Sequence, residues 1–411
     1  MILIASADSA NPAKSRTPTL RIGDLVDDVH TWNPSTDATG SDIDYIDIGS
    51  VDQSAKQVVA RPKIAAADAP SRARQLVKAG DILVSTVRPN LNSVALVPDN
   101  LDGATASTGF CVLRPKKETL STRYLFQWVK TPLFIGAMSK LATGQSYPAV
   151  SDRIILDSQI PLPTFPEQRR IAAILDAADA LRQKRRLALC LLDELSQSIF
   201  IEMFGDPVSN PKEWDEKSTL GDCADIASGV TKGRNLNGKP SREVPYLAVY
   251  NVQDKALKLD QVKTIDATDD EIERYSLRKH DLLLTEGGDP DKLGRGTLWN
   301  DELPECIHQN HVFRVRLHSK DIEPFYLNWL VGSQRGKKYF LRSAKQTTGI
   351  ASINMTQLRA FPLLIPPIKL QREFRDRIGS LNSTVVRTAA HAASIEALFA
   401  TFQHRAFRGE L

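Results

Sequence analysis

Two short segments concentrate basic and amide side chains, the groups that contact phosphates and hydrogen-bond base edges in nucleic acids. Residues 56–78 carry basic residues against the single acid Asp68, and residues 232–242 carry basic residues and no acid. A solvated basic face is the alternative for either segment alone. Because the same composition occurs twice, the pattern favours a nucleic-acid partner. The candidate contacts in these segments are Arg61, Lys63, Arg72, Arg74, Lys232, Arg234, Asn235, Asn237 and Lys239.

A glycine-rich stretch, residues 287–296, has the outward look of a phosphate loop. It fails the G-x-x-x-x-G-K-[ST] pattern because Leu293 stands where the second glycine is required, and it is not G-x-G-x-x-G either. We predict a glycine loop that projects Lys292 and Arg295 toward a ligand, and purely structural turn chemistry is an equal alternative. The segment after residues 81–85 offers Arg88, Asn90 and Asn92 at a similar offset, so these five side chains join the candidate DNA contacts.

No motif supports catalysis or metal binding. Cys306, His308 and His311 are close enough in sequence to suggest zinc, but they lie on an apparent strand that sends the two histidines to opposite faces. The chain has no G-x-S-x-G, no H-E-x-x-H and no Asp/Asn-Pro-Pro-Tyr/Phe tetrapeptide of an adenine methyltransferase. We therefore predict no catalytic residue and no metal site.

Length and composition describe a globular protein with more than one domain. The chain has 411 residues, of which 42% are hydrophobic and 25% charged, and its net charge is only +4. Chains above about 300 residues usually divide into several cores. The four cysteines form no C-x-x-C pair, as expected of reduced thiols. No apolar run approaches the roughly 18 residues of a spanning helix, so we expect a soluble, cytoplasmic protein without membrane contact.

The elements that position these side chains occur twice, at an offset of about 200 residues. Residues 80–85 (G-D-I-L-V-S) correspond to residues 280–285 (H-D-L-L-L-T), where an acidic residue leads into a buried strand. Residues 108–114 likewise correspond to residues 310–316. The repeat predicts two whole domains, each followed by its own long helix.

Two segments, 167–203 and 370–405, carry apolar residues at heptad spacing. Such narrow stripes favour two helices paired antiparallel, and the alternative is that each helix packs only on its own domain. The predicted packing residues are Ile171, Ile174, Leu181, Leu192, Leu195, Ile199, Phe374, Ile378, Leu381, Val385, Ile395 and Phe402.

Each domain ends in a proline-rich segment that leads into its helix. The first copy reads I-P-L-P-T-F-P-E-Q-R-R-I at residues 160–171, and F-I-E-M-F-G-D at 200–206 is echoed by F-R-G-E-L at 407–411. On these motifs the whole chain resembles the specificity subunit of type I restriction-modification enzymes. The second copy departs from the family pattern, with I-K-L-Q at residues 368–371 where P-x-x-E-Q is typical.

This resemblance implies an α+β fold of two similar mixed α/β target-recognition domains, separated by two long helices that pair as an antiparallel coiled coil. The expected boundaries are a first recognition domain at 1–163, a central spacer helix at 164–206, a second recognition domain at 207–365 and a final spacer helix at 366–411.

The resemblance also implies a non-catalytic function. Each domain is expected to read one half of a bipartite site on double-stranded DNA, and the helices are expected to set the spacing. Two methylation subunits would carry S-adenosylmethionine, and restriction subunits would use ATP. The sequence leaves two other functions open. One is a nucleotide-binding enzyme that uses residues 287–296, and the other is a structural adaptor whose basic patches hold acidic proteins.

Overall fold

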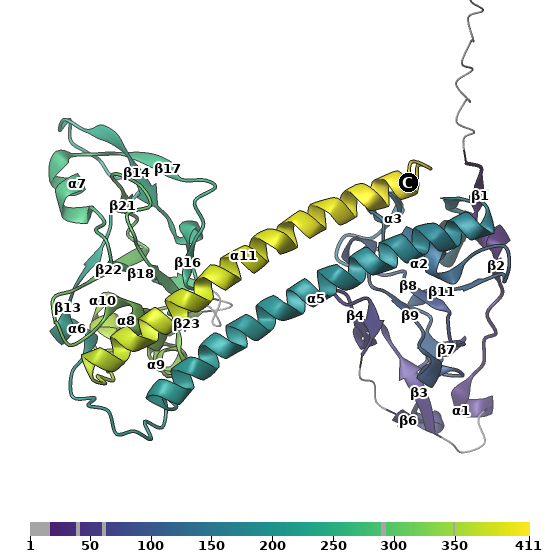
Figure 1. The fold of residues 1–411 in the computed structure, drawn as a ribbon, viewed down its shortest axis with the longest axis horizontal. Helices are drawn as coiled ribbons and strands as arrows, with labels where there is room; N and C mark the ends of the chain where they lie inside the picture. Colours follow the sequence, from purple (N-terminus) through teal and green to yellow (C-terminus); the bar gives the residue numbers. More distant parts are fainter. Residues whose placement is uncertain (1–16, 38–41, 60–62, 289–292, 348–349) are drawn as a thin grey trace, which may run out of the picture. The chain divides into compact units, whose positions relative to one another are not determined.

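A computed structural model describes residues 17–37, 42–59, 63–288, 293–347 and 350–411. By packing, the chain divides into two compact units. Unit 1 comprises Met1–Ala188 and Thr388–Leu411, and unit 2 comprises Leu189–Arg387. The two long helices, α5 (Phe165–Phe204) and α11 (Ile368–Ala406), contribute to both units (Figure 1). Each unit is therefore a mixed α/β domain together with part of both helices.

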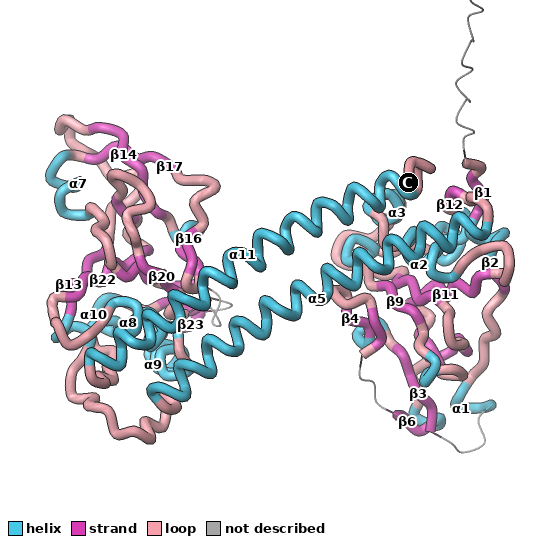
Figure 2. Tube along the Cα trace, in the orientation of Figure 1, coloured by secondary structure: helices cyan, strands magenta, loops and turns pink. Residues whose placement is uncertain are grey.

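The domain of unit 1 contains two main sheets (Figure 2). The six-stranded sheet has the order β2 (Val26–Asp27), β11 (Phe110–Pro115), β8 (Ile82–Ser85), β9 (Val94–Leu96), β5 (Gln57–Val58), β4 (Val51–Asp52). The four-stranded sheet has the order β6 (Lys63–Ala65), β3 (Asp42–Ile46), β10 (Thr105–Ser107), β7 (Ala73–Leu76), and β3 and β10 run parallel. A short pair, β1 (Thr19–Arg21) with β12 (Gln159–Pro161), joins the two ends of the domain.

The domain of unit 2 repeats this topology. Its four-stranded sheet has the order β13 (Ala224–Ser228), β22 (Val312–Leu317), β18 (Leu282–Thr285), β20 (Gly296–Leu298). A second sheet has the order β17 (Lys263–Ala267), β14 (Arg242–Leu247), β21 (Ile307–His308), in which β14 and β21 run parallel as β3 and β10 do. Two further sheets are the hairpin β15 (Val252–Gln253) with β16 (Ala256–Leu257), and β19 (Gly287–Gly288), β24 (Ile350–Ser352), β23 (Lys345–Thr347). The predicted duplication is confirmed by this shared strand pairing.

Short helices connect the sheets to the long ones. Unit 1 has α1 (Pro34–Asp37), α2 (Thr122–Val129), α3 (Pro132–Leu141) and α4 (Asp152–Asp157). Unit 2 has α6 (Leu220–Cys223), α7 (Asp269–Tyr275), α8 (Pro324–Gly332), α9 (Gln334–Ser343) and α10 (Met355–Arg359). None of the helices in the described part of the chain combines the length and apolar content that crossing a membrane requires.

Aromatic side chains at the end of each long helix contact the domain that the other long helix follows. In unit 1, the Phe407 ring centroid lies 5.1 Å from that of Tyr124 and 5.0 Å from that of Trp128, both on α2. In unit 2, the Phe204 centroid lies 4.7 Å from that of Tyr326 on α8. Each domain is thus covered by the start of its own long helix and by the end of the other one.

A buried glutamine explains the Gln-Arg motif at the start of both long helices. The Gln168 amide donates to the carbonyl oxygens of Thr119 (3.1 Å) and Pro163 (3.0 Å) and accepts from the Ser121 backbone N–H (2.8 Å). Gln371 makes the equivalent three bonds in unit 2, to Asp321, Pro366 and Glu323. The side chain satisfies backbone groups that burial would otherwise leave unpaired, so the motif is structural.

The row of buried and half-buried residues along each long helix, here called the seam, follows heptad spacing. On α11, Phe374 and Ile378 are buried, and Leu381, Val385, Ile395 and Phe402 are half-buried. On α5, Ile171 is buried and Ile174, Leu192 and Ile199 are half-buried. Leu181 and Leu195 were predicted in the seam but are 43% and 47% exposed.

On α5, the second of the two predicted heptad positions is displaced by one residue from the position that is buried. The seam continues through Leu175, Arg182 and Ser196, which lie four residues after the first position and not three. Apolar residues occur at both the three-residue and the four-residue spacing, so the sequence pattern does not distinguish the two. Two of the actual seam residues are polar, which apolar periodicity does not detect.

Arg182 fixes the antiparallel register in unit 1. Its guanidinium lies 2.6 Å from the Glu396 carboxylate and 4.1 Å over the Phe399 ring. Nearer the start of α5, Arg170 donates to the Leu411 carbonyl oxygen at 2.7 Å. Early residues of α5 therefore meet late residues of α11, and a polar seam residue of this kind specifies register.

Candidate nucleic-acid interface

After β8 the chain leaves the sheet at Thr86, whose backbone N–H and carbonyl are both hydrogen-bonded to other segments of the domain. The Thr86 N–H donates to the Gly109 carbonyl at 2.9 Å, and the Thr86 carbonyl accepts from the Val150 N–H at 2.9 Å. Beside this segment, the Arg88 guanidinium lies 4.6 Å over the Tyr147 ring, which is 68% exposed. A cation and an aromatic ring are therefore presented together at the surface of unit 1.

Unit 2 holds the equivalent segment in the same way. The Glu286 N–H donates to the His311 carbonyl at 3.0 Å, and the Glu286 carbonyl accepts from the Ile353 N–H at 2.9 Å. We call these two backbone bonds around Thr86 or Glu286 the loop frame. Here the exposed pair is His311 Nδ1 and Glu286 Oε2, 2.5 Å apart. The sequence does not single out Tyr147 or Glu286, and it suggests His311 only as a metal ligand, although the aligned strand ends mark the place of all three.

The other basic candidates of the first domain are spread over the four-stranded sheet. Lys63 lies on β6 and Arg74 on β7, which are the two opposite edges of that sheet, and Arg72 immediately precedes β7. Lys63 and Arg72 are exposed, whereas Arg74 is half-buried and donates to the Ala73 carbonyl. The structure therefore does not gather them into one patch. Arg61 lies outside the described residues.

Asn90 and Asn92 lie beside Arg88, in the loop after β8. Asn90 is exposed, and Asn92 has a left-handed backbone with φ of 49°. The Asn92 carbonyl accepts from the Lys56 ammonium at 2.5 Å, which ties this loop to the turn between β4 and β5. Of the predicted residues of unit 1, these two and Arg88 are the ones that the structure brings together.

The second basic segment forms an exposed loop between β13 and β14. Lys232, Asn235, Asn237 and Lys239 are exposed, and Asn237 has a left-handed backbone with φ of 50°. The Asn235 side chain accepts from the Asn237 N–H at 2.8 Å, which shapes the turn. These four side chains remain available to a ligand.

Arg234, predicted as a DNA contact, has a structural role in the domain. Its guanidinium donates two bonds of 2.6 Å to the Glu271 carboxylate on α7 and a third, of 2.9 Å, to the Asp266 carbonyl. The hydrogen bonds from Arg234 hold the pKa of Glu271 below its ordinary value. A bidentate pair of this kind attaches Arg234 to the domain, so its guanidinium is already partnered and the DNA contact stays a prediction.

The glycine loop also differs from expectation. Leu293 is buried, and Arg295 turns back to donate to the Gln253 side chain at 3.2 Å, with its Nε buried. Arg295 therefore supports the hairpin β15–β16 and does not project toward a ligand. Lys292 lies outside the described residues. Nothing in the described part of this loop favours the nucleotide-binding alternative.

Cys306, His308 and His311 do not converge on a common point. Cys306 and His308 are 2% and 0% exposed, whereas the His311 side chain is 55% exposed and binds Glu286. Among the described residues, no group of three or more histidine, cysteine or acidic side chains is arranged to hold a metal ion.

His308 gives unit 2 a pH-dependent stability. Its Nδ1 lies 2.7 Å from the Val312 carbonyl and must donate there, while Nε2 is buried without a partner. Burial lowers the pKa of His308 from 6.5 to about 4. At pH above 6.5 the ring is neutral in both states. As the pH falls from 6.5 to 4 only the unfolded chain gains a proton, so we expect unit 2 to lose about 3 kcal/mol of stability.

Urea unfolding of the full chain between pH 4.5 and 7 measures this effect. His308→Leu removes the titrating ring and should flatten the pH dependence of unit 2. The exposed His311 supplies the control His311→Gln, which should keep the wild-type slope. Equal slopes for wild type and His308→Leu would contradict the assignment.

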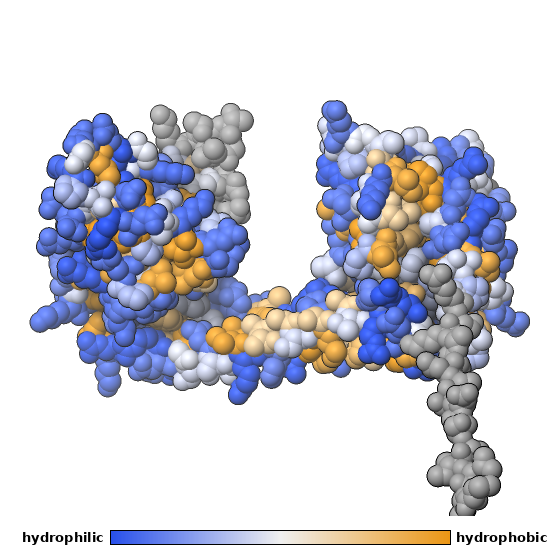
Figure 3. Space-filling model, turned by 90° about the horizontal axis from the view of Figure 1, so that it is seen from above, coloured by the Kyte–Doolittle hydropathy of each residue, from blue (hydrophilic) through white to orange (hydrophobic). Residues whose placement is uncertain are grey.

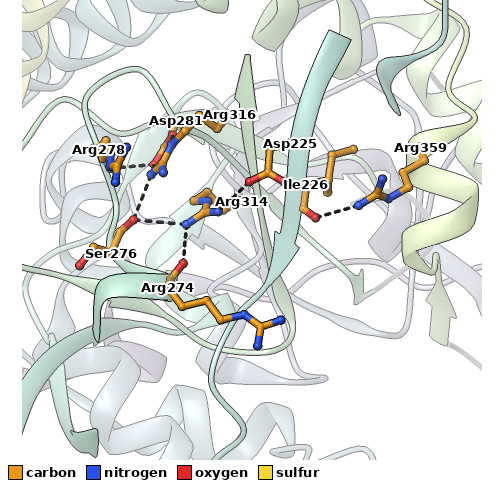
Figure 4. A network of polar contacts seen from close by, with 9 residues as sticks. All are labelled: Asp225, Ile226, Arg274, Ser276, Arg278, Asp281, Arg314, Arg316 and Arg359. Atoms are coloured by element: carbon orange, nitrogen blue, oxygen red, sulfur yellow. Dashed lines mark hydrogen bonds and ion pairs between the residues drawn. The ribbon is translucent and has the colours of Figure 1, made fainter. Parts of the chain in front are cut away.

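A buried carboxylate organises the core sheet of each domain. In unit 2, Asp281 is 1% exposed and accepts two bonds from Arg316, of 2.8 and 2.7 Å, and one from the Arg278 N–H at 2.7 Å (Figure 4). In unit 1, Asp81 accepts from Arg114 at 2.9 and 2.6 Å and from the Lys78 N–H at 2.7 Å. This explains the acidic residue that precedes the buried strand in both repeats.

Unit 2 adds a second buried cation beside this pair. Arg314 donates to the Arg274 carbonyl at 2.9 Å and to the Asp225 carboxylate at 3.1 Å (Figure 4). Burial lowers the pKa of Arg314 from its ordinary value. The equivalent position of unit 1 is Val112, so this contact belongs to the second domain alone.

Comparisons with known proteins agree with this duplicated architecture. Residues 19–189 and 211–396 each match the family described as the type I restriction modification DNA specificity domain. The StySPI specificity subunit of Salmonella potsdam is 25% identical over 323 residues, covering 74% of this chain and 68% of that protein. The EcoKI specificity subunit of Escherichia coli K12 is also 25% identical, over 322 residues, with coverage of 74% and 68%.

A solved structure shows the same fold. It comes from work on the assembly and conformational transition of the type I restriction-modification system. It is 24% identical, with a TM-score of 0.58, and the match covers 96% of this chain and 98% of that chain. The two family matches span most of the chain, and each contains one loop frame and one buried Asp–Arg pair. The chain therefore belongs to the family of type I restriction-modification DNA specificity domains, and it carries two copies of the domain.

Proposed function

We propose that this chain is the DNA-reading subunit of a type I restriction-modification assembly, in which each domain reads one half of a bipartite, asymmetric site. In this proposal the chain supplies recognition and no catalytic group. Two methylation subunits bind S-adenosylmethionine and modify adenine in each half-site. Restriction subunits supply ATP-dependent translocation and cleavage.

The observation that carries the proposal is the loop frame. Both domains hold the same backbone bonds at Thr86 and Glu286, yet the exposed side chains on the frame are different: Arg88 and Tyr147 in one, Glu286 and His311 in the other. Shared scaffolds with different exposed groups are what reading two unlike half-sites requires, because phosphate contacts alone carry no sequence information.

The paired helices supply the second part of the proposal. α5 and α11 each contribute to both units, and their seam fixes an antiparallel register through Arg182 and Glu396. We infer that the length of this pair determines how many unread base pairs separate the two half-sites. At about 1.5 Å per residue, each turn of helix then corresponds to one or two base pairs of about 3.4 Å.

The long helices also expose apolar surface (Figure 3). On α5, Leu187 and Leu191 are 59% and 53% exposed, close to Leu181 and Leu195. Exposed apolar stripes of this kind mark protein interaction sites. We assign this stripe to the methylation subunits, since the family assembles with such partners.

Exchanging one domain tests the modular part of the proposal. The block should be residues 215–365, because the bridges Asp215–Ile365 and Thr219–Pro362 close the domain and must move together. With the corresponding block of a related specificity subunit, we expect one half of the methylated motif to change and the other half to stay. Methylome sequencing of a host that carries the chimaera and its methylation partner measures this. A change in both halves, or in neither, would refute the modular reading.

A further inference from the structure

Arg88 is prepared for recognition by its backbone as well as by its ring contact. It has a left-handed backbone with φ of 49°, and its N–H donates to the Pro148 carbonyl, next to Tyr147, at 2.7 Å. The guanidinium is thereby held on the Tyr147 ring, and no carboxylate or carbonyl among the described residues accepts from it. Its N–H donors are left free while the side chain has already lost much of its rotational freedom.

The second domain presents the opposite chemistry on the same frame. The Glu286 side chain is 33% exposed and the His311 side chain 55% exposed, with Nδ1 and Oε2 2.5 Å apart. The bond to His311 fixes one carboxylate oxygen and leaves the other as an acceptor. A carboxylate repels phosphate, so at a DNA surface its favourable contact is with a base that offers an amino group.

We propose that the loop frame is a base-reading position in both domains: Arg88, supported by Tyr147, reads a guanine in one half-site, and Glu286, supported by His311, reads a cytosine in the other. This inference rests on the proposed function and adds the identity of the bases. The Arg88 fork matches the O6 and N7 acceptors of guanine in the major groove, and Glu286 accepts from the N4 amino group of cytosine.

Conservative substitutions separate base reading from phosphate binding. Arg88→Lys keeps the charge and loses the planar fork, so a phosphate contact survives it and a bidentate guanine contact does not. Glu286→Gln keeps the size of the side chain and adds donors, which suits adenine N6 and N7. The exposed residues Arg153 and Glu273 supply the controls Arg153→Lys and Glu273→Gln, one in each unit.

The experiment uses the full chain reconstituted with its methylation subunits, with the motif read by methylome sequencing and binding measured on a duplex library. For Arg88→Lys and Arg88→Ala we expect discrimination to fall roughly 10- to 100-fold at one G·C position of the first half-site. For Glu286→Gln we expect one cytosine position of the second half-site to relax toward adenine. Tyr147→Ala should weaken the same position as Arg88→Lys, and Tyr147→Phe should not.

Two results would overturn the inference. One is an unchanged motif in both Arg88→Lys and Glu286→Gln. The other is an Arg88→Ala variant that binds all sequences equally more weakly while Arg88→Lys binds as wild type, which describes a phosphate contact. A wild-type complex that methylates no bipartite motif would instead refute the proposed function itself.

Discussion

Asp281→Asn is expected to lower the free energy of unfolding of unit 2 by about 3–5 kcal/mol, because it removes one partner of a buried ion pair. The carboxylate is 1% exposed and accepts three hydrogen bonds, two of them from the Arg316 guanidinium, whose side chain is 24% exposed. The asparagine amide offers one acceptor oxygen and turns an NH₂ group toward a cation that then has no counter-ion. The strands β18 and β22, which this pair joins, form the centre of the sheet.

Amide hydrogen exchange of the full chain in urea measures the effect, because peptides of unit 2 can be followed separately from those of unit 1. Asp81→Asn is the matched variant in unit 1 and should produce the same loss there, with unit 2 unaffected. Combining Asp281→Asn with Arg316→Met should recover part of the stability, since the unpaired cation is removed. Wild-type exchange in unit 2 of Asp281→Asn would contradict this account.

Lengthening both spacer helices by one heptad is expected to move the half-sites apart without changing what they read. The insertions belong between Ala188 and Leu189 in α5 and between Arg387 and Thr388 in α11, where the two units meet in sequence. Seven residues add about 10 Å of helix, which is about three base pairs of B-DNA, and they keep the seam in frame. The new motif should keep both half-sequences, and methylation at the original spacing should be lost.

Methylome sequencing again supplies the measurement. The control replaces residues 183–189 and the matching heptad of α11 in place with the inserted sequence, which changes composition but not length and leaves Arg182 and Glu396 in position. Its spacer should remain as in wild type. If an insertion variant assembles with its partners and still methylates the original spacing, the helices do not set the distance between the half-sites.

Sequence periodicity predicted the repeated domains and both long helices because these depend on local rules. Buried strands after Asp81 and Asp281 read as short apolar runs, and α5 and α11 begin and end within about two residues of the expected positions. Periodicity did not predict the helix positions where a polar residue is stabilised by tertiary contacts. Arg182 in the seam is stabilised by Glu396 and Phe399, which lie more than 200 residues away in sequence.

The interface was harder to predict because charge alone does not tell which cations are already paired. Arg234 is one example, because the sequence does not show that its guanidinium is paired with Glu271. Conversely, no local signal marks Glu286 and His311 as a DNA contact: an acid does not resemble one, His311 suggests only a metal ligand, and the pair forms only when β18 and β22 align. Strand register determines which side chains lie next to each other across a sheet, and a single sequence does not reveal that register.

The way unit 1 is assembled has a consequence for its synthesis. Phe399, Ala406 and Phe407 share a core with Tyr124 and Trp128, so this unit needs residues 388–411. At about 5–20 residues per second, the ribosome takes roughly 10–40 s to make the intervening stretch of the chain. Unit 2 is continuous from Leu189 to Arg387 and is completed first. The domain that is translated first is therefore finished last, and until then Tyr124 and Trp128 lack the cover that residues 388–411 provide.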